Sequence, residues 1–207
     1  MTDWRNILDW RQKVAALYQP LSSSGALERE WAGFVAARRT LIHSHAAAMS
    51  VPDADAPHYF VYNPAFALQS HFEPIDDGSR HTVSGGYDGT ISFKAIARSI
   101  ELSPILGCEL TLYWLEQYGG GLFLPFKDAS CGTATYAGGR YLIDSVKSAF
   151  LGISEDGALR LDFNYSYFPS CAHDDRYICP LSPPENTLPV FISAGECWHY
   201  HTAVFQS

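Results

Sequence analysis

Leu-Phe-Leu-Pro-Phe-Lys-Asp (residues 122–128) opens a stretch, ending at Glu196, in which short apolar runs alternate with polar turns. The stretch continues through Thr-Tyr-Ala-Gly-Gly-Arg-Tyr-Leu (135–142), Leu-Asp-Phe-Asn (161–164), Pro-Ser-Cys-Ala (169–172), Cys-Pro-Leu-Ser-Pro-Pro-Glu-Asn (179–186) and Leu-Pro-Val (188–190). Short apolar runs bounded by glycine, proline, asparagine and aspartate are typical of β-strands joined by turns. This part of the chain therefore predicts strands rather than helices.

The same pattern extends upstream to Tyr59. Apolar residues recur at a spacing near two in the runs Gln69–Pro74, Thr90–Leu102, Glu109–Leu115, Leu122–Phe126, Arg140–Ser145, Leu159–Asn164 and Val190–Ser193. Between these runs lie Asp-Asp-Gly, Ser-Pro, Gly-Gly-Gly and Glu-Asp-Gly, which supply turn residues and positive φ. Many short strands separated by turns predict an antiparallel β-barrel or sandwich over residues 59–196.

The first 45 residues have a helical periodicity instead. Over residues 3–18, and again over residues 24–43, apolar residues recur every three or four positions, which predicts two amphipathic helices. We expect Pro20 to end the first helix and Ser24 to cap the second. The fold class is therefore mainly β, preceded by two α-helices.

Length and charge narrow the range of functions. The chain has 207 residues and a formal net charge of −8 at pH 7, so we expect one domain over residues 1–207, with a helical segment at residues 1–45. Negative charge opposes binding to nucleic acid and to anionic lipid, and no apolar run reaches the roughly 18 residues of a membrane helix. The N-terminus has no signal-peptide pattern and the cysteine count of five is odd, so we expect a cytoplasmic protein with reduced thiols.

Four motifs occur in a fixed order: Gly-Gly-Arg-Tyr-Leu, Leu-Asp-Phe-Asn, Cys-Pro-Leu and Pro-Pro-Glu-Asn. Together they resemble the uncharacterised DUF1684 proteins of bacteria and archaea, most strongly over residues 108–196. The resemblance implies a predominantly β fold after two helices, and a cluster of polar residues that the members share without an assigned activity. It does not supply a substrate.

Polar side chains at predicted strand ends and turns form the candidate site, because scaffolds usually carry function there. We expect a small-molecule-binding β-barrel protein that acts by acid–base chemistry, as an isomerase, cyclase or hydrolase without an organic cofactor. The expected catalytic residues are Asp162 to move a proton, Tyr136 and Asn164 to stabilise negative charge, and Glu185 as a second acid or base. The expected substrate-binding residues are Arg140, which would orient an anionic group, together with Asp128, Thr133, Asn186, Trp114, Tyr113, Cys171 and Cys179.

Other interpretations of these residues stay open. The polar cluster can be purely structural, with Arg140 paired to Asp128 or Asp162, or it can bind a small molecule without turning it over. Cys171 and Cys179 can be a thiol pair, a metal half-site or packed sulfur. In an extended strand Cys197, His199 and His201 would share one face, which makes a site for zinc or another transition metal the least favoured alternative. The sequence does not indicate an oligomeric state.

Overall fold

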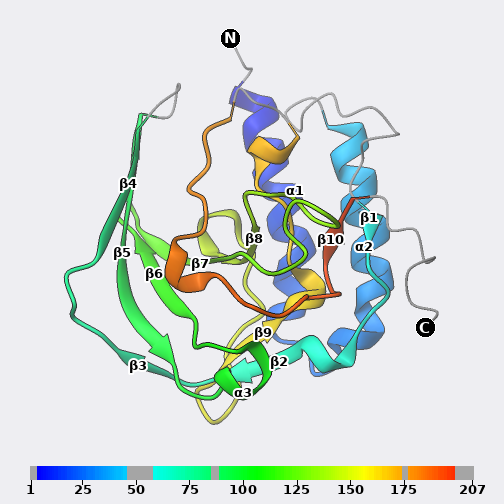
Figure 1. Cartoon of the computed structure of the whole chain (residues 1–207). Coiled ribbons are helices and arrows are strands. Elements are labelled where there is room, and N and C mark those ends of the chain that lie inside the picture. The colour runs from blue at the N-terminus through cyan, green and yellow to red at the C-terminus, as the bar shows by residue number, and fades with distance from the viewer. Residues whose placement is uncertain (1–3, 46–57, 85–88, 174–176, 199–207) are drawn as a thin grey trace.

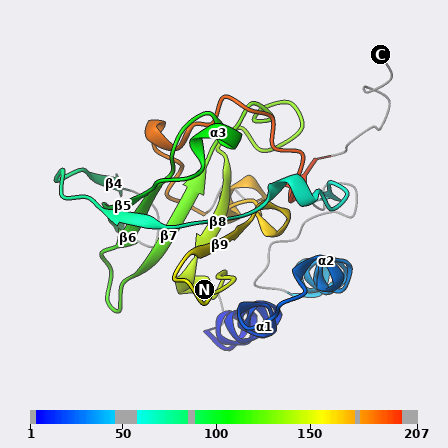
Figure 2. The same cartoon turned by 90° about the horizontal axis from the view of Figure 1, so that it is seen from below.

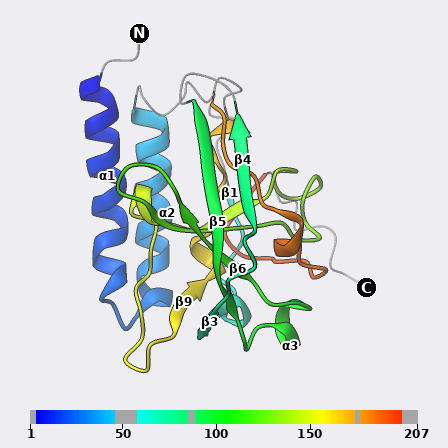
Figure 3. The same ribbon diagram turned by 90° about the vertical axis from the view of Figure 1, so that its left-hand side faces the viewer.

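The structure is a computed structural model of the whole chain, and it describes residues 4–45, 58–84, 89–173 and 177–198. Helices α1 (Trp4–Ser22) and α2 (Leu27–Ser44) lie side by side (Figures 1 and 3). Val14 and Tyr18 of α1 and Phe34 and Leu41 of α2 are buried in one core cluster. The two predicted helices are confirmed. Within the described residues, no helix is long and apolar enough to cross a membrane.

The prediction that Pro20 ends the first helix was wrong, because α1 continues to Ser22. A proline in the last turn removes one backbone hydrogen bond, and hydroxyl groups there bind the exposed carbonyls: Ser22 Oγ donates to the Gln19 carbonyl at 2.9 Å. Ser24 Oγ accepts from the Ala26 N–H at 3.0 Å, just before α2 begins. Ser24 therefore holds the start of α2, although Ala26 is the residue directly before the helix.

The main sheet is antiparallel and has the strand order β3-β5-β6-β7-β8, with β4 also paired to β5. Its strands are β3 (Phe72–Pro74), β4 (Arg80–Ser84), β5 (Thr90–Ser99), β6 (Thr111–Leu115), β7 (Gly121–Phe126) and β8 (Arg140–Asp144). Two short antiparallel ladders join distant segments, namely β1 (His58–Tyr59) with β10 (Glu196–Cys197), and β2 (Ala67–Ser70) with β9 (Leu159–Asp162).

The expected antiparallel β structure after two helices is confirmed, but the barrel alternative is not. In the part of the chain that the structure describes, β3 and β8 do not pair with each other, so the main sheet stays open. Seen from below, α1 and α2 form a layer on one side of the strands, and the short helix α3 (Ser103–Leu106) lies on the other side (Figure 2).

Strand β7 is buried on both faces, which explains why the run Leu122–Phe126 is apolar throughout. Phe123 packs in the core cluster that contains residues of α1 and α2. Leu124 and Phe126 pack in a second cluster with Leu161 and Ile192. Strands covered on both faces lose the alternation of apolar and polar residues.

Three predicted strands differ in the structure. The run Gln69–Pro74 divides at His71 between β2, which pairs with β9, and β3, which pairs with β5. The run Leu159–Asn164 divides at Asp162, because β9 ends there and residues Phe163–Tyr165 form a 3₁₀ turn whose Asn164 N–H donates to the Asp162 side chain. The run Val190–Ser193 is not a strand. The backbone of Ile192 is instead bonded by the buried side chains of Arg140 and Asp128.

Candidate functional site

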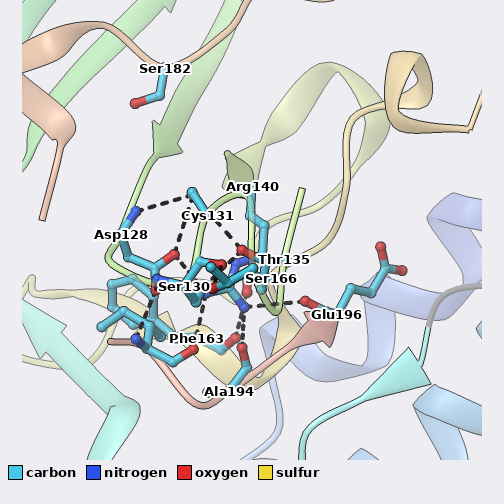
Figure 4. Close-up of polar contacts among 12 residues, drawn as sticks. Asp128, Ser130, Cys131, Thr135, Arg140, Phe163, Ser166, Ser182, Ala194 and Glu196 are labelled. Carbon is cyan, nitrogen blue, oxygen red and sulfur yellow. Dashed lines mark hydrogen bonds and ion pairs between the residues drawn. The ribbon is translucent and has the colours of Figure 1, made fainter. Parts of the chain in front are cut away.

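Arg140, at the start of β8, is fully buried and acts as a structural anchor. Its Nη2 donates to Asp128 Oδ1 and to the Ile192 carbonyl, each at 3.1 Å, and its Nη1 donates to the Ala194 carbonyl and to the Glu196 carbonyl. Figure 4 shows the guanidinium directed at Asp128, Ala194 and Glu196. Neither member of the Arg140–Asp128 ion pair has an exposed side chain. The pair bonds backbone groups of residues 192–196, and neither of its side chains is exposed to a ligand.

Asp128 completes this anchor from the opposite side. Its Oδ2 accepts from the Ile192 N–H at 2.8 Å and from the Ser130 N–H at 3.2 Å. Both carboxylate oxygens are therefore bonded within the fold. The expectation that Asp128 and Arg140 bind substrate finds no support in this arrangement, because both side chains are fully buried and neither lines the hollow beside α2 or the hollow beside β4.

Asn186 has a similar structural role between β6 and β7. Its Oδ1 accepts from the Thr111 N–H at 2.7 Å, and its Nδ2 donates to the carbonyls of Thr111 at 2.9 Å and Pro125 at 2.8 Å. The side chain is completely buried. Asn186 thus links the loop before it to two strands, and both hydrogens of its Nδ2 are used within the fold.

Asp162 and Asn164 lie together, as the sequence predicted, and Asp162 lines a different hollow from Tyr136. Asp162 Oδ1 accepts from the Asn164 side chain at 2.8 Å, and Oδ2 accepts from the Tyr62 hydroxyl at 2.9 Å. Burial raises the pKa of the Asp162 carboxyl, although these hydrogen bonds oppose the shift. Asp162 borders a hollow of about 740 Å³ that also includes the first turn of α2. Both of its oxygens already have partners.

Thr133 and Trp114 are exposed and away from either hollow. Thr133 Oγ1 donates to the Ser130 carbonyl at 2.9 Å within a turn. Trp114 points to the opposite face of β6 from the buried Tyr113, and its ring packs against Gly120, where a Cβ would collide with it. Trp114 and Tyr113 therefore do not line the same site.

The structure gathers other predicted residues around a second hollow, of about 520 Å³, which we call the thiol pocket. It is lined by residues of β4 and β5, by the turn before β8, and by the segment that carries two cysteines: His81, Thr82, Val83, Phe93, Tyr136, Cys171, Tyr177, Ile178, Cys179, Leu181 and Pro183. Its volume is within the range of small-molecule sites. Tyr136, Cys171 and Cys179 are thus brought together as expected.

His81 joins Glu185 and Tyr113 to the thiol pocket. Its ring stacks on Phe93 with centroids 5.2 Å apart, and its Nε2 lies 3.1 Å from Glu185 Oε1. The same carboxylate oxygen accepts from the Tyr113 hydroxyl at 2.7 Å. Partial burial alone would raise the pKa of Glu185, but hydrogen bonds from its own backbone N–H, from Tyr113 and from His81 lower it overall. Glu185 is therefore an ionised carboxylate that orients an imidazole.

The two cysteines of the pocket are in contact. Cys171 lies in a 3₁₀ turn (Ser170–Ala172), and its backbone N–H donates to Cys179 Sγ at 3.3 Å. The Cys171 thiol also donates to the Cys179 sulfur, which lowers the pKa of Cys179 and raises that of Cys171. The Tyr136 hydroxyl lies 3.7 Å from Cys171 Sγ, and burial raises the pKa of Tyr136 to about 12. The contact with Cys171 therefore favours the thiolate form of Cys179.

Of the three residues of the possible metal site, the structure describes only Cys197. Cys197 is buried, and burial raises the pKa of its thiol to about 12, which disfavours the thiolate that a metal would need. His199 and His201 lie outside the described residues. Among the residues that the structure does describe, no group of three His, Cys, Asp or Glu side chains is placed to hold a metal ion.

Sequence reasoning missed His81, the residue that connects Glu185 to the pocket. His81 belongs to β4, whose run Arg80–Ser84 follows a turn, but no motif links it to Glu185, which is 104 positions further along the chain. The only available signal was its place beside Thr82 and Val83 in a short β-favouring run. The contact between His81 and Glu185 forms only because the fold brings these two distant segments together.

Comparisons with known proteins agree with the motif pattern and leave the chemistry open. A family model described as "Protein of unknown function (DUF1684)" matches residues 55–197. The chain is similar to the solution NMR structure of an uncharacterized protein from Haloarcula marismortui, with 25% sequence identity, a TM-score of 0.52, and coverage of 82% of this chain and 95% of that chain. No curated protein matches.

Proposed function

Because this chain belongs to the DUF1684 family, whose description gives no activity, we propose its function from geometry: it binds a small organic molecule in the thiol pocket and moves a proton on it through His81. The contact that carries the proposal is the 3.1 Å approach of His81 Nε2 to Glu185 Oε1 at the pocket wall. A carboxylate that holds one imidazole nitrogen sets the ring's orientation and leaves the other nitrogen for proton transfer.

The charges assign a role to each nitrogen. Since Glu185 is ionised, it accepts the proton of His81 Nε2, and Nδ1 carries the free lone pair of the neutral ring. When Nδ1 takes a proton from the bound molecule, the imidazolium that forms is stabilised by Glu185. The same proton can then be returned to another atom of that molecule. His81 thus takes the proton-moving role that the sequence had suggested for Asp162, and Glu185 keeps a role beside it.

The other walls suit a small, partly apolar molecule. Val83, Phe93, Ile178 and Leu181 supply apolar surface, and the Tyr136 hydroxyl is a donor for an oxygen on which negative charge develops. Isomerisation, cyclisation or hydrolysis fits a site of this kind, because each needs a movable proton and no organic cofactor.

Thermal-shift and product screening against a library of small organic metabolites tests the proposal. We expect at least one compound to raise the melting temperature of the wild-type protein, and Leu181→Trp, which adds bulk at the exposed rim of the pocket, to abolish that shift. Ile105→Trp is the matched control, since Ile105 is also exposed but does not line the pocket. If no compound distinguishes wild type from Leu181→Trp, the pocket is not a binding site.

Turnover of the compound found in this way separates catalysis from binding alone. His81→Ala should lower turnover by about 10²- to 10⁴-fold and change binding only a few-fold. His71→Ala is the control, because His71 Nδ1 also lies 3.1 Å from a carboxylate, that of Glu101, but outside the pocket. A compound that binds and is never converted would establish the second candidate, a non-catalytic binding protein, in which loss of Phe93 or Tyr136 weakens binding more than loss of His81.

A further inference from the structure

Cys171 and Cys179 form a contact that proton transfer by His81 does not use. We propose that they are a dithiol site that reduces low-molecular-weight disulfides, with Cys179 as the attacking sulfur, Cys171 as the resolving sulfur, and an intramolecular disulfide as the product. This proposal is independent of the small-molecule function above, because it needs neither His81 nor Glu185.

The contact geometry supports the pairing. The Cys171 N–H lies 3.3 Å from Cys179 Sγ, and the Cys171 thiol donates to that same sulfur. On the other side of Cys179, the Tyr141 hydroxyl donates to the Pro180 carbonyl at 2.7 Å and so holds the segment in place. The two sulfurs are therefore kept within reach of each other by backbone and side-chain contacts.

The surroundings of Cys179 favour a reactive sulfur. Hydrogen bonds from Cys171 stabilise a negative charge on it, and Lys147 adds a favourable positive charge, so that the pKa of Cys179 falls although burial opposes the change. A thiolate is the attacking form in thiol–disulfide exchange. Both sulfurs line a pocket of about 520 Å³ and are only half-buried, so a small disulfide can reach them.

The other cysteines lack these features. Cys108 and Cys131 contact no second cysteine among the described residues, and burial raises the pKa of each thiol. Cys197 is buried, with a pKa raised for the same reason. A metal half-site is a poorer explanation of the pair, because no third metal-binding side chain joins it within the described part of the chain.

The reaction balances in two exchanges. In the first, the Cys179 thiolate attacks one sulfur of a disulfide RSSR, the S–S bond breaks, and RS⁻ leaves while Cys179 becomes a mixed disulfide. In the second, Cys171 loses its proton and attacks Cys179 Sγ, which forms the Cys171–Cys179 bond and releases the second RS⁻. The protein loses two electrons and RSSR gains them. One RS⁻ takes the proton of Cys171, and the other takes from water the proton that Cys179 released when it ionised.

The raised pKa of Cys171 does not block the second exchange. Its largest cause is the hydrogen bond that the Cys171 thiol donates to the charged Cys179 sulfur. Once Cys179 is in a mixed disulfide it is neutral, so that cause disappears and Cys171 becomes easier to deprotonate. Cys179 therefore attacks first, because it is the sulfur that carries the negative charge, and Cys171 attacks second.

Intact-mass and peptide-mapping analysis of the reduced full chain, mixed with hydroxyethyl disulfide, tests the proposal. We expect wild type to lose the mass of two hydrogens and to show a Cys171–Cys179 cross-linked peptide. Cys171→Ser should accumulate one hydroxyethylthio adduct on Cys179. In Cys179→Ser, the adduct should form on Cys171 at least about tenfold more slowly than it forms on Cys179 in Cys171→Ser. Cys108→Ser is the matched control and should form the cross-link at the wild-type rate.

The proposal is overturned if wild type acquires adducts without the cross-link, or if Cys108 reacts as fast as Cys179. Should Cys171→Ser fail to fold, the wild-type time course decides alone, because the mixed disulfide must appear on Cys179 before the cross-link. The cross-link is read by mass and the acid–base function by turnover of a compound found in the screen, so the fate of each proposal is read separately.

Discussion

Arg140 and Asp128 form an ion pair in which both side chains are fully buried, with Nη2 3.1 Å from Oδ1. The pair bonds the backbone of residues 192–196, a segment that the sequence predicted in part as a strand. Breaking a buried pair from one side leaves an uncompensated charge. Arg140→Ala or Asp128→Ala should therefore lower the free energy of unfolding by about 3 to 5 kcal/mol, measured by urea denaturation.

Arg80→Ala is the control for this prediction, because Arg80 is also bonded to a carboxylate, that of Glu116, but at the solvent-exposed surface. Exposed pairs contribute little to stability. Equal effects of Arg140→Ala and Arg80→Ala would show that burial of the first pair is not what matters.

Asn186→Ala should be destabilising by about 2 to 4 kcal/mol, since it leaves the buried N–H and carbonyl of Thr111 and the Pro125 carbonyl without their partner. The adjacent Thr187→Ala, at an exposed side chain, should change stability little. Urea denaturation of both variants checks this. An Asn186→Ala protein as stable as Thr187→Ala would contradict a structural role for Asn186 and reopen its role as a ligand contact.

Tyr18 and Tyr59 should respond in opposite ways to loss of the hydroxyl. Tyr18 is buried and its hydroxyl has no partner among the described residues, whereas the Tyr59 hydroxyl donates to Glu196 Oε1 at 2.8 Å. Tyr18→Phe should leave stability unchanged or raise it by about 1 kcal/mol, and Tyr59→Phe should lower it by about 1 to 3 kcal/mol. Thermal unfolding of the two variants measures the difference. A loss of stability in Tyr18→Phe would indicate that its hydroxyl is bonded after all.

The pH dependence of stability should include a contribution from Glu109. Burial opposes ionisation of this carboxylate, but hydrogen bonds from Ser99 and from the backbone N–H groups of Leu102 and Ser103 lower its pKa overall. Because the folded pKa lies below the unfolded value of about 4.3, the stabilisation is complete above that pH and is lost as the pH falls through the folded pKa.

Glu109→Gln should accordingly be less stable than wild type at neutral pH, and the gap should narrow in acid. Urea denaturation from about pH 7 down to about pH 3 follows it. Glu73→Gln, on the exposed strand β3, is the control and should show little difference from wild type over that range. A gap for Glu109→Gln that widens as the pH falls would refute the assignment.

The local pattern of the chain was enough to predict both helices and several strands, although β1, β4 and β10 lay outside the predicted runs. Spacing near 3.6 identified both helices, and short apolar runs identified β6, β7, β8 and β9, because side-chain direction along a helix or strand follows from backbone geometry alone. The motif order identified the family, which the match over residues 55–197 confirms. The single-domain and cytoplasmic predictions stay predictions.

Only the tertiary structure decided which polar residues meet. Tyr136, Cys171 and Cys179 share a pocket, Asp162 borders another, and Arg140 with Asp128 is sealed inside the fold. His81 reaches Glu185 across 104 positions of sequence. Periodicity says which side of its own strand a residue occupies, but whether that side faces a cavity, a core or solvent depends on how distant segments pack, and the free energy of that packing is shared among many contacts along the whole chain.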